Sequence, residues 1–138
     1  MNLLLAMMLM FSAAPAPAGV AGNWVTADKS VVQMYPCGQL LCGKLVHIEG
    51  NHTVDDQNPS ADLRKRPLCG LNIVEGFKSA DGTHFDGGRV YDPESGKTYR
   101  GVITLQGDVL KLRGYVGVPL FGRTEVWHRA QGNVAECK

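Results

Sequence analysis

The sequence predicts an all-β protein, a single eight-stranded antiparallel up-and-down barrel with one long loop after the third strand. Glycine accounts for 17 of the 138 residues, as frequent tight turns require. In the second half of the chain, turn signals recur about every ten residues, between segments that alternate apolar and polar side chains. No convincing helix separates these segments, which excludes a parallel sheet. A two-sheet sandwich is the alternative to the barrel.

The first residues predict a secretory signal peptide. A continuous apolar run from Leu3 to Phe11 is followed by small residues that end in Ala16-Pro17-Ala18, an A-x-A cleavage site. A transmembrane anchor is the alternative, but the run is well short of the ~20 apolar residues that a bilayer needs. We therefore expect a signal peptide at residues 1–18 and a barrel domain at residues 19–138. The mature protein would be periplasmic or secreted and would not span the membrane.

The mature part divides into expected strands separated by turns. Pro36 ends the second strand, and Gly76 in the fourth indicates a bulge or a bend. Residues 92–97 form a strong turn, because Pro93 presets one dihedral angle and Gly96 takes the left-handed position. In chain order, the expected strands cover residues 22–26, 31–35, 43–49, 71–77, 85–91, 98–105, 109–115 and 123–129.

The sixth and seventh strands show which faces point inward. Tyr99 and Ile103 share one face of the sixth strand, opposite Arg100. Leu112 stands opposite Arg113 in the seventh strand. We therefore expect the apolar side chains inside the barrel and both arginines outside.

Residues 50–67 break this pattern, because they form a polar stretch without periodicity. Loops of this length in a small domain are usually functional lids or mobile segments. A short helical turn is expected at residues 60–64, with Ser60 as its cap. The adjacent acids Asp55 and Asp56 are interpreted as solvated side chains of this loop.

The cysteines predict disulfides in an oxidising compartment, because an even number follows the signal peptide. Four cysteines allow three pairings. Cys37 and Cys42 flank an expected hairpin tip, which would place them opposite each other across two strands and leave Cys69 to pair with Cys137. A zinc site is the weaker alternative, because there is no C-x-x-C pair and the histidines lack ligand spacing.

Charge and motifs favour no other function class. The net charge is +1, and the only basic run, residues 64–66, is too short for a nucleic-acid surface. There is no glycine-rich phosphate loop and no Gly-x-Ser-x-Gly elbow, and disulfide bonding would remove any free thiolate. We therefore expect neither a cofactor nor a metal nor an enzyme, and the sequence does not indicate an oligomeric state.

Both ends of the mature chain resemble the calycin pattern of lipocalins and fatty-acid-binding proteins. Those families open with a Gly-x-Trp strand, here Gly22-Asn23-Trp24, and close with a basic residue over the tryptophan, here Arg129. A guanidinium on an indole gains a cation–π interaction at the barrel floor. The resemblance implies that Trp24 and Arg129 close one end of a lipocalin-like barrel.

The middle of the chain resembles an exported bacterial family, domain of unknown function 2147. The resemblance implies a lipocalin-like barrel in the cell envelope or secreted, with no established reaction. It covers essentially the whole mature chain and is carried by Gly22-x-Trp24, Tyr35-Pro36-Cys37, Leu41-Cys42-Gly43, Asp56-x-Asn58-Pro59, Arg66-Pro67-Leu68-x-Gly70, Tyr91-Asp92-Pro93-x-x-Gly96-Lys97-x-Tyr99 and Trp127-x-Arg129.

The barrel interior is the main candidate for a function. We expect a small hydrophobic or amphipathic ligand to bind at the end away from Trp24, under residues 50–67. The expected lining residues are Met34, Val46, Tyr99, Ile103 and Leu112. The alternative is an envelope structural or interaction module with a filled barrel, no ligand, and an exposed apolar patch at residues 118–121.

Overall fold

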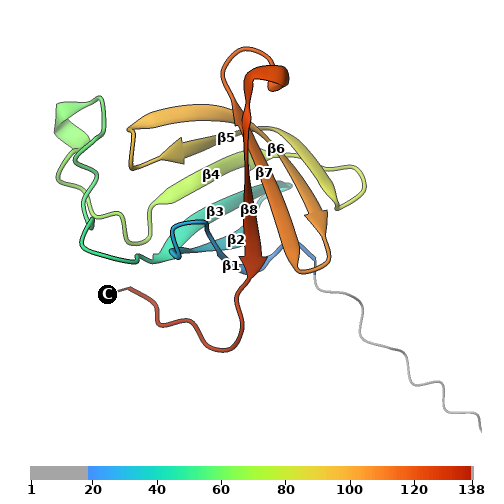
Figure 1. Ribbon diagram of the computed structural model, residues 1–138, viewed down its shortest axis with the longest axis horizontal. Coiled ribbons are helices and arrows are strands. Elements are labelled where there is room, and N and C mark those ends of the chain that lie inside the picture. Colours follow the sequence, from blue (N-terminus) through green and yellow to red (C-terminus); the bar gives the residue numbers. More distant parts are fainter. Residues whose placement is uncertain (1–18, 138) are drawn as a thin grey trace, which may run out of the picture.

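The computed structural model describes residues 19–137, and its strands close into one antiparallel barrel in chain order (Figure 1). The predicted signal peptide lies outside the described residues. The strands are β1 (Gly22–Val25), β2 (Val31–Cys37), β3 (Leu40–His47), β4 (Asn72–Phe77), β5 (His84–Asp92), β6 (Lys97–Gln106), β7 (Val109–Tyr115) and β8 (Arg123–Arg129). Single 3₁₀ turns lie in two of the loops, η1 (Ala61–Leu63) and η2 (Pro119–Phe121). The predicted barrel is confirmed, and the sandwich alternative was wrong.

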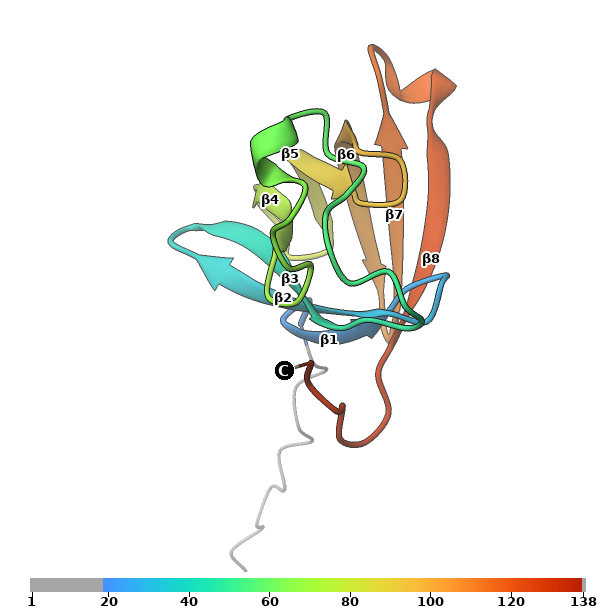
Figure 2. The same cartoon turned by 90° about the vertical axis from the view of Figure 1, so that its left-hand side faces the viewer.

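The barrel closes where the first strand meets the last. β1 pairs with β8 through Trp24 opposite Arg129 and Val25 opposite His128. All other pairs join strands that are consecutive in the chain. Short turns or loops join the other consecutive strands, and the long connection between β3 and β4 is the exception, as Figure 2 shows from the side. This is why local turn signals predict so much of the fold.

The β2–β3 hairpin is longer than its sequence suggests. β2 continues through Pro36, which pairs with Leu41. On the side of β1, the pairing with β2 reaches only as far as Met34, which lies opposite Gly22. Pro36 lies beyond it, so its missing N–H removes no hydrogen bond between β1 and β2. Gly38 takes a positive φ of 65° in the tight turn.

Two disulfides are present, with the predicted pairing. Cys37 and Cys42 lie diagonally across the β2–β3 hairpin rather than directly opposite each other, because Cys37 faces Leu40 in the register. Cys69 and Cys137 tie the C-terminal segment to the chain just before β4. The Cys137 amide also donates to the Val46 carbonyl over 2.6 Å.

The packed half of the interior surrounds Phe77. Its ring occupies the space over Gly88 and Gly101, where an added Cβ would meet ring atoms at 2.2 and 2.8 Å. A larger residue at either glycine would therefore displace the ring. Other fully buried side chains in this core are Trp24, Met34, Ile103, Leu110, Val32 and Val74.

Candidate functional site

A cavity of about 940 Å³ opens at one end of the barrel. The β1–β2 turn, the start of the loop after β3, the β5–β6 turn and the β7–β8 loop surround it. This is the end away from the Cys37–Cys42 hairpin tip. The volume lies within the ~300–1,000 Å³ typical of small-molecule sites.

The deeper wall of the cavity is apolar, and its rim is polar. Leu45, Ile73 and Val90 come from three consecutive strands and line the inner part, together with Trp127 of β8. Tyr99 of β6 adds an aromatic surface. An apolar interior with a polar rim suits an amphipathic molecule.

The predicted lining residues lie in different places. Tyr99 lines the cavity. Met34, Ile103 and Leu112 are buried in the packed core. Val46 is buried as the extra residue of a bulge, because β3 pairs Leu45 with Val32 and His47 with Val31. About half of the wall comes from loops and turns, where strand alternation gives no guidance.

The opposite end is closed by an arginine on a tryptophan. The Arg129 guanidinium lies 4.3 Å from the centroid of the buried Trp24 ring. Arg129 Nε donates to Asp108 Oδ1 over 2.8 Å, and a terminal nitrogen donates to the Gly19 carbonyl. Trp24 Nε1 donates to the Val20 carbonyl. These contacts fix the N-terminal segment to the barrel floor, away from the cavity.

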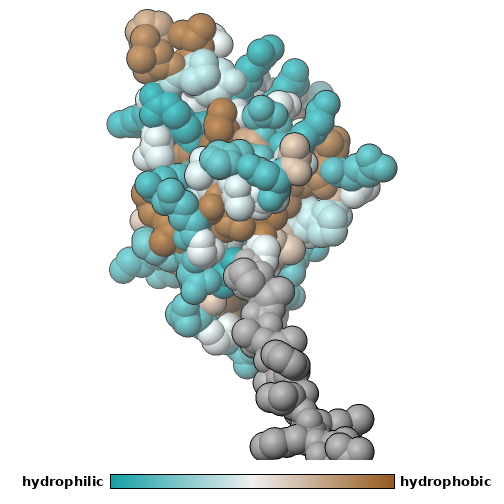
Figure 3. All heavy atoms as spheres, turned by 90° about the vertical axis from the view of Figure 1, so that its right-hand side faces the viewer, coloured by the Kyte–Doolittle hydropathy of each residue, from teal (hydrophilic) through white to brown (hydrophobic). Residues whose placement is uncertain are grey.

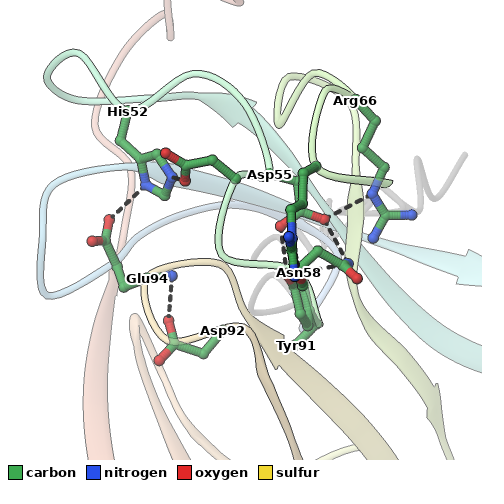
Figure 4. Close-up of polar contacts among 9 residues, drawn as sticks. His52, Asp55, Asn58, Arg66, Tyr91, Asp92 and Glu94 are labelled. Carbon is green, nitrogen blue, oxygen red and sulfur yellow. Dashed lines mark hydrogen bonds and ion pairs between the residues drawn. The ribbon is translucent and has the colours of Figure 1, made fainter. Parts of the chain in front are cut away.

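A buried carboxylate anchors the long loop (residues 50–67) to the barrel, as Figure 4 shows. Asp55 is fully buried and accepts hydrogen bonds from the Tyr91 hydroxyl, from Asn58 Nδ2 over 2.9 Å and from Arg66 Nε over 2.8 Å. The Arg66 guanidinium also lies 6.0 Å from the Tyr91 ring centroid. Three partners from two parts of the chain therefore compensate for burial of the charge.

This network shifts two pKa values in opposite directions. Burial alone would raise the pKa of Asp55, but the hydrogen bonds from Tyr91, Asn58 and Arg66 outweigh it and lower the pKa. Burial and the bond to Asp55 raise the pKa of Tyr91 to about 12. Asp55 is therefore ionised and Tyr91 neutral at neutral pH, so the pair serves as a structural anchor.

The solvated interpretation of Asp55 was wrong. The loop folds back on itself, with the Asp55 amide donating to the Arg66 carbonyl, and this brings the side chain under the loop. Asp56, the next residue, points out and lies about half exposed beside His52. The predicted helical turn is present as η1, but its cap differs: the Asn58 side chain accepts from the Ser60 amide over 2.8 Å, and Ser60 makes no side-chain cap bond.

His52 joins the loop to the rim of the cavity. Its Nε2 lies 2.7 Å from Asp56 Oδ1, and its Nδ1 lies 3.3 Å from Glu94 Oε1 of the β5–β6 turn. Burial opposes the charge, but the two carboxylates outweigh it and raise the pKa of His52. Within residues 50–67, only His52 lines the cavity. The long loop therefore lies mostly beside the mouth of the cavity.

A carboxyl group of β8 also faces the cavity. Glu125 pairs with the inward-facing Leu112 and lines the wall. Burial raises the pKa of Glu125, the Trp127 indole N–H and Arg123 lower it, and Asp28 and Asp92 raise it further. Glu125 was not among the predicted lining residues, although its place two positions before the buried Trp127 in an alternating strand is a signal for it.

Trp127 carries a polar atom without a partner. Only 2% of its surface is exposed, and Nε1 makes no hydrogen bond within residues 19–137, although it lies near enough to Glu125 to affect that carboxyl group. The other such buried side-chain atom in this part of the chain is Asn23 Oδ1. A buried N–H without an acceptor costs about 1–3 kcal/mol.

The described residues contain neither a metal-binding cluster nor a helix that could span a membrane. Residues 19–137 contain no group of three or more His, Cys, Asp or Glu that could hold a metal ion. No helix in this range has the length and apolar character that crossing a membrane requires.

Arg100 is exposed, and Arg113 donates to the carbonyls of Pro119 and Leu120, where it holds the β7–β8 loop.

Comparison with protein families identifies the family of this chain. Residues 22–129 match the model of a family described as "Uncharacterized protein conserved in bacteria (DUF2147)". The chain belongs to this DUF2147 family. The match begins at the first strand of the barrel and ends at Arg129, so the family corresponds to the barrel itself.

A solved structure supports the fold assignment for this DUF2147 protein. The structure is described as "Protein HP1028 from the human pathogen Helicobacter pylori belongs to the lipocalin family". The two chains share 21% identity with a TM-score of 0.73, over 80% of this chain and 82% of the other. At this identity the likeness shows a lipocalin-like fold. None of the curated proteins matches the chain.

Proposed function

We propose that this DUF2147 protein binds a small amphipathic or hydrophobic molecule in the open end of its barrel. The observation that carries the proposal is the cavity of about 940 Å³, lined by Leu45, Ile73 and Val90 at depth. A barrel with a filled interior would leave no such volume. The closed floor at Trp24 and Arg129 leaves the other end as the route of entry.

A neutral apolar dye tests this proposal. N-phenyl-1-naphthylamine emits more strongly in apolar surroundings, and we expect saturable binding to the purified mature protein that 1-dodecanol displaces. Val90→Trp fills the cavity and should abolish the emission gain. Ala27→Trp places the same ring at the exposed rim, where the risk to folding is small, and should weaken binding. Leu120→Asp, outside the cavity wall, is the control and should bind as the wild type does. Unchanged binding in both tryptophan variants would contradict the proposal.

A second candidate function is an interaction surface on the β7–β8 loop. Val118, Leu120 and Phe121 are 50%, 79% and 78% exposed. Figure 3 shows an apolar cluster at the top of the molecule, where this loop lies in Figure 1. Exposed apolar clusters on small proteins often mark contact sites. Cross-linking in envelope extract should recover a partner with the wild type and lose it with Leu120→Asp; equal recovery would contradict this candidate.

Export of the chain is part of the proposal. Two disulfides support an oxidising compartment, and the family is bacterial, which is consistent with the periplasm or the exterior. Cleavage after Ala18 would leave Gly19 as the first residue. Expression of the full sequence in a bacterial host, followed by N-terminal sequencing of the envelope fraction, should give Gly19; an intact chain in the cytosol would contradict export.

A further inference from the structure

The mouth of the cavity carries an excess of negative charge. Its wall contains five carboxylates against one arginine, Arg123, and one histidine, His52. The five carboxylates surround the opening, because they come from the β1–β2 turn, the chain after β3, the β5–β6 turn region and β8. They are Asp28, Glu49, Asp92, Glu94 and Glu125. An anionic head group at this opening would be repelled.

Glu125 lies where the charged rim meets the apolar interior. Its register partner on the adjacent strand β7 is the buried Leu112. Trp127 lies two residues further along β8, on the same face as Glu125. The charges of Asp28 in the β1–β2 turn and of Asp92 at the end of β5 raise the pKa of Glu125, and Arg123 lowers it. Three carboxylates from separate elements therefore share one field at the mouth.

Trp127 supplies an independent indication that the wall is shaped for a ligand. Its indole N–H is buried beside Glu125, whose pKa it lowers, but it makes no hydrogen bond of normal geometry within the described residues. A polar donor in this state costs free energy unless an acceptor reaches it. The same region has the aromatic rings of Tyr99 and Tyr115, and aromatic faces attract organic cations.

We propose that the cavity takes a cationic amphiphile, whose ammonium group lies among Asp28, Asp92 and Glu125 and whose hydrocarbon chain extends to the apolar floor. A ligand that also carries an acceptor oxygen next to the ammonium group provides a partner for Trp127 Nε1. This inference rests on the proposed ligand-binding function and specifies its ligand class.

Three probes with the same hydrocarbon chain separate head-group preference from binding itself. We would measure the affinities of dodecyltrimethylammonium, 1-dodecanol and dodecanoate by calorimetry at neutral pH and low salt, with the two ionic probes below their micelle concentrations and the alcohol below its solubility limit. The cationic probe should bind about tenfold more tightly than the alcohol, and dodecanoate should bind most weakly. Raising the salt concentration should narrow these differences.

Matched variants locate the effect. Glu125→Gln should weaken binding of the cationic probe about tenfold and leave 1-dodecanol unchanged. Arg123→Gln, on the same strand, should strengthen binding of the cationic probe. Glu75→Gln changes the net charge equally but lies exposed on β4, outside the cavity wall, and should have no effect. These substitutions lie at exposed or half-buried positions, so folding should be retained.

An ester probe tests the role of Trp127. Lauroylcholine carries an ester carbonyl that is separated from its quaternary ammonium group by the ester oxygen and two methylene groups, and it should bind the wild type more tightly than dodecyltrimethylammonium does. Trp127→Phe keeps an aromatic ring but removes the N–H, so this advantage should disappear. An advantage that persists in Trp127→Phe would overturn the assigned role of the indole.

The possible outcomes separate the preference for a cationic ligand from the ligand-binding function on which it rests. Equal affinity for all three head groups, or tighter binding of dodecanoate, would overturn the cationic preference and leave the cavity function in place. Failure of all three probes to bind would overturn both. Loss of the cationic preference in Glu125→Gln but not in Glu75→Gln would support the inference.

Discussion

The hydroxyl of Tyr91 donates a hydrogen bond to the buried carboxylate of Asp55, and this contact ties the long loop to the end of β5. The two residues are 36 positions apart in the chain. Arg66 and Asn58 complete the set of partners of the carboxylate. The β5–β6 turn packs on the same loop, because a Cβ at Gly96 would lie 1.9 Å from the Gln57 carbonyl oxygen. This contact and the packing at Gly96 together hold the long loop against the rim of the cavity.

Removing this anchor should destabilise the fold. Tyr91→Phe deletes one hydrogen bond to a charged group, and we expect a loss of about 1.5–3 kcal/mol in the free energy of unfolding. Asp55→Asn should cost at least as much, because it removes the charge that Arg66 faces. Urea denaturation measures both. Asp56→Asn, an exposed neighbour paired with His52, is the control and should cost less than about 1 kcal/mol. Equal losses in Asp55→Asn and Asp56→Asn would contradict the anchor.

The same network predicts how stability depends on acid. The folded state lowers the pKa of Asp55 below the ordinary value of 3.8, so at a pH just below that value the unfolded chain binds more protons than the folded chain does. The contribution of Asp55 is therefore fully present above about pH 4–5 and is lost as the pH falls through the folded-state pKa. The stability difference between wild type and Asp55→Asn should shrink below pH 4 in urea titrations. A difference that stays constant down to pH 2 would show that Asp55 carries no shifted pKa.

The arginine at the barrel floor should contribute to stability without affecting the cavity. Arg129→Ala removes the cation–π contact with Trp24 and the bond to Asp108, and we expect a loss of about 2 kcal/mol. Thermal unfolding followed by circular dichroism measures this. Arg89→Ala, at an exposed position of β5, should change stability by less than about 0.5 kcal/mol. Binding of N-phenyl-1-naphthylamine to Arg129→Ala should match that of the wild type; if it is lost, floor and cavity are not separate.

The two disulfides should differ in their contribution. Cys69 and Cys137 are 68 residues apart, and Cys37 and Cys42 are 5 apart. In the chain-entropy model, the longer bridge contributes about 4 kcal/mol and the shorter about 2 kcal/mol. Replacing each pair by serines and measuring unfolding in urea should give this order. The reverse order would mean that the C-terminal segment is held mainly by other contacts, such as the Cys137 amide on the Val46 carbonyl.

Much of the fold could be predicted because its signals are local. Turn residues and alternation in β5 to β8 specify hairpins, and spacing alone suggested the bridge between Cys37 and Cys42. Asp55 could not be placed in the same way, because its burial depends on how residues 50–67 fold against β5. Its partners Asn58, Arg66 and Tyr91 do occur in the motifs that indicate the family, and this was the available signal.

The cavity is harder to predict for a related reason. Whether side chains fill a barrel depends on their combined volume across all strands, and alternation states only which of them face inward. Ile103 and Leu112 face inward as expected, and yet they are buried in the core and do not line the cavity. Glu125 and Trp127 lie in the open half, and their shared environment becomes visible only when the β1–β2 turn and β5 are placed next to β8.

Calorimetric titration of 1-dodecanol at several temperatures is the most direct test of a ligand-binding barrel. We predict saturable one-to-one binding to the wild type with a negative heat-capacity change, because apolar surface is buried, and no binding to the cavity-filled Val90→Trp. Absence of saturable heat with the wild type, or the same isotherm for both proteins, would contradict the account.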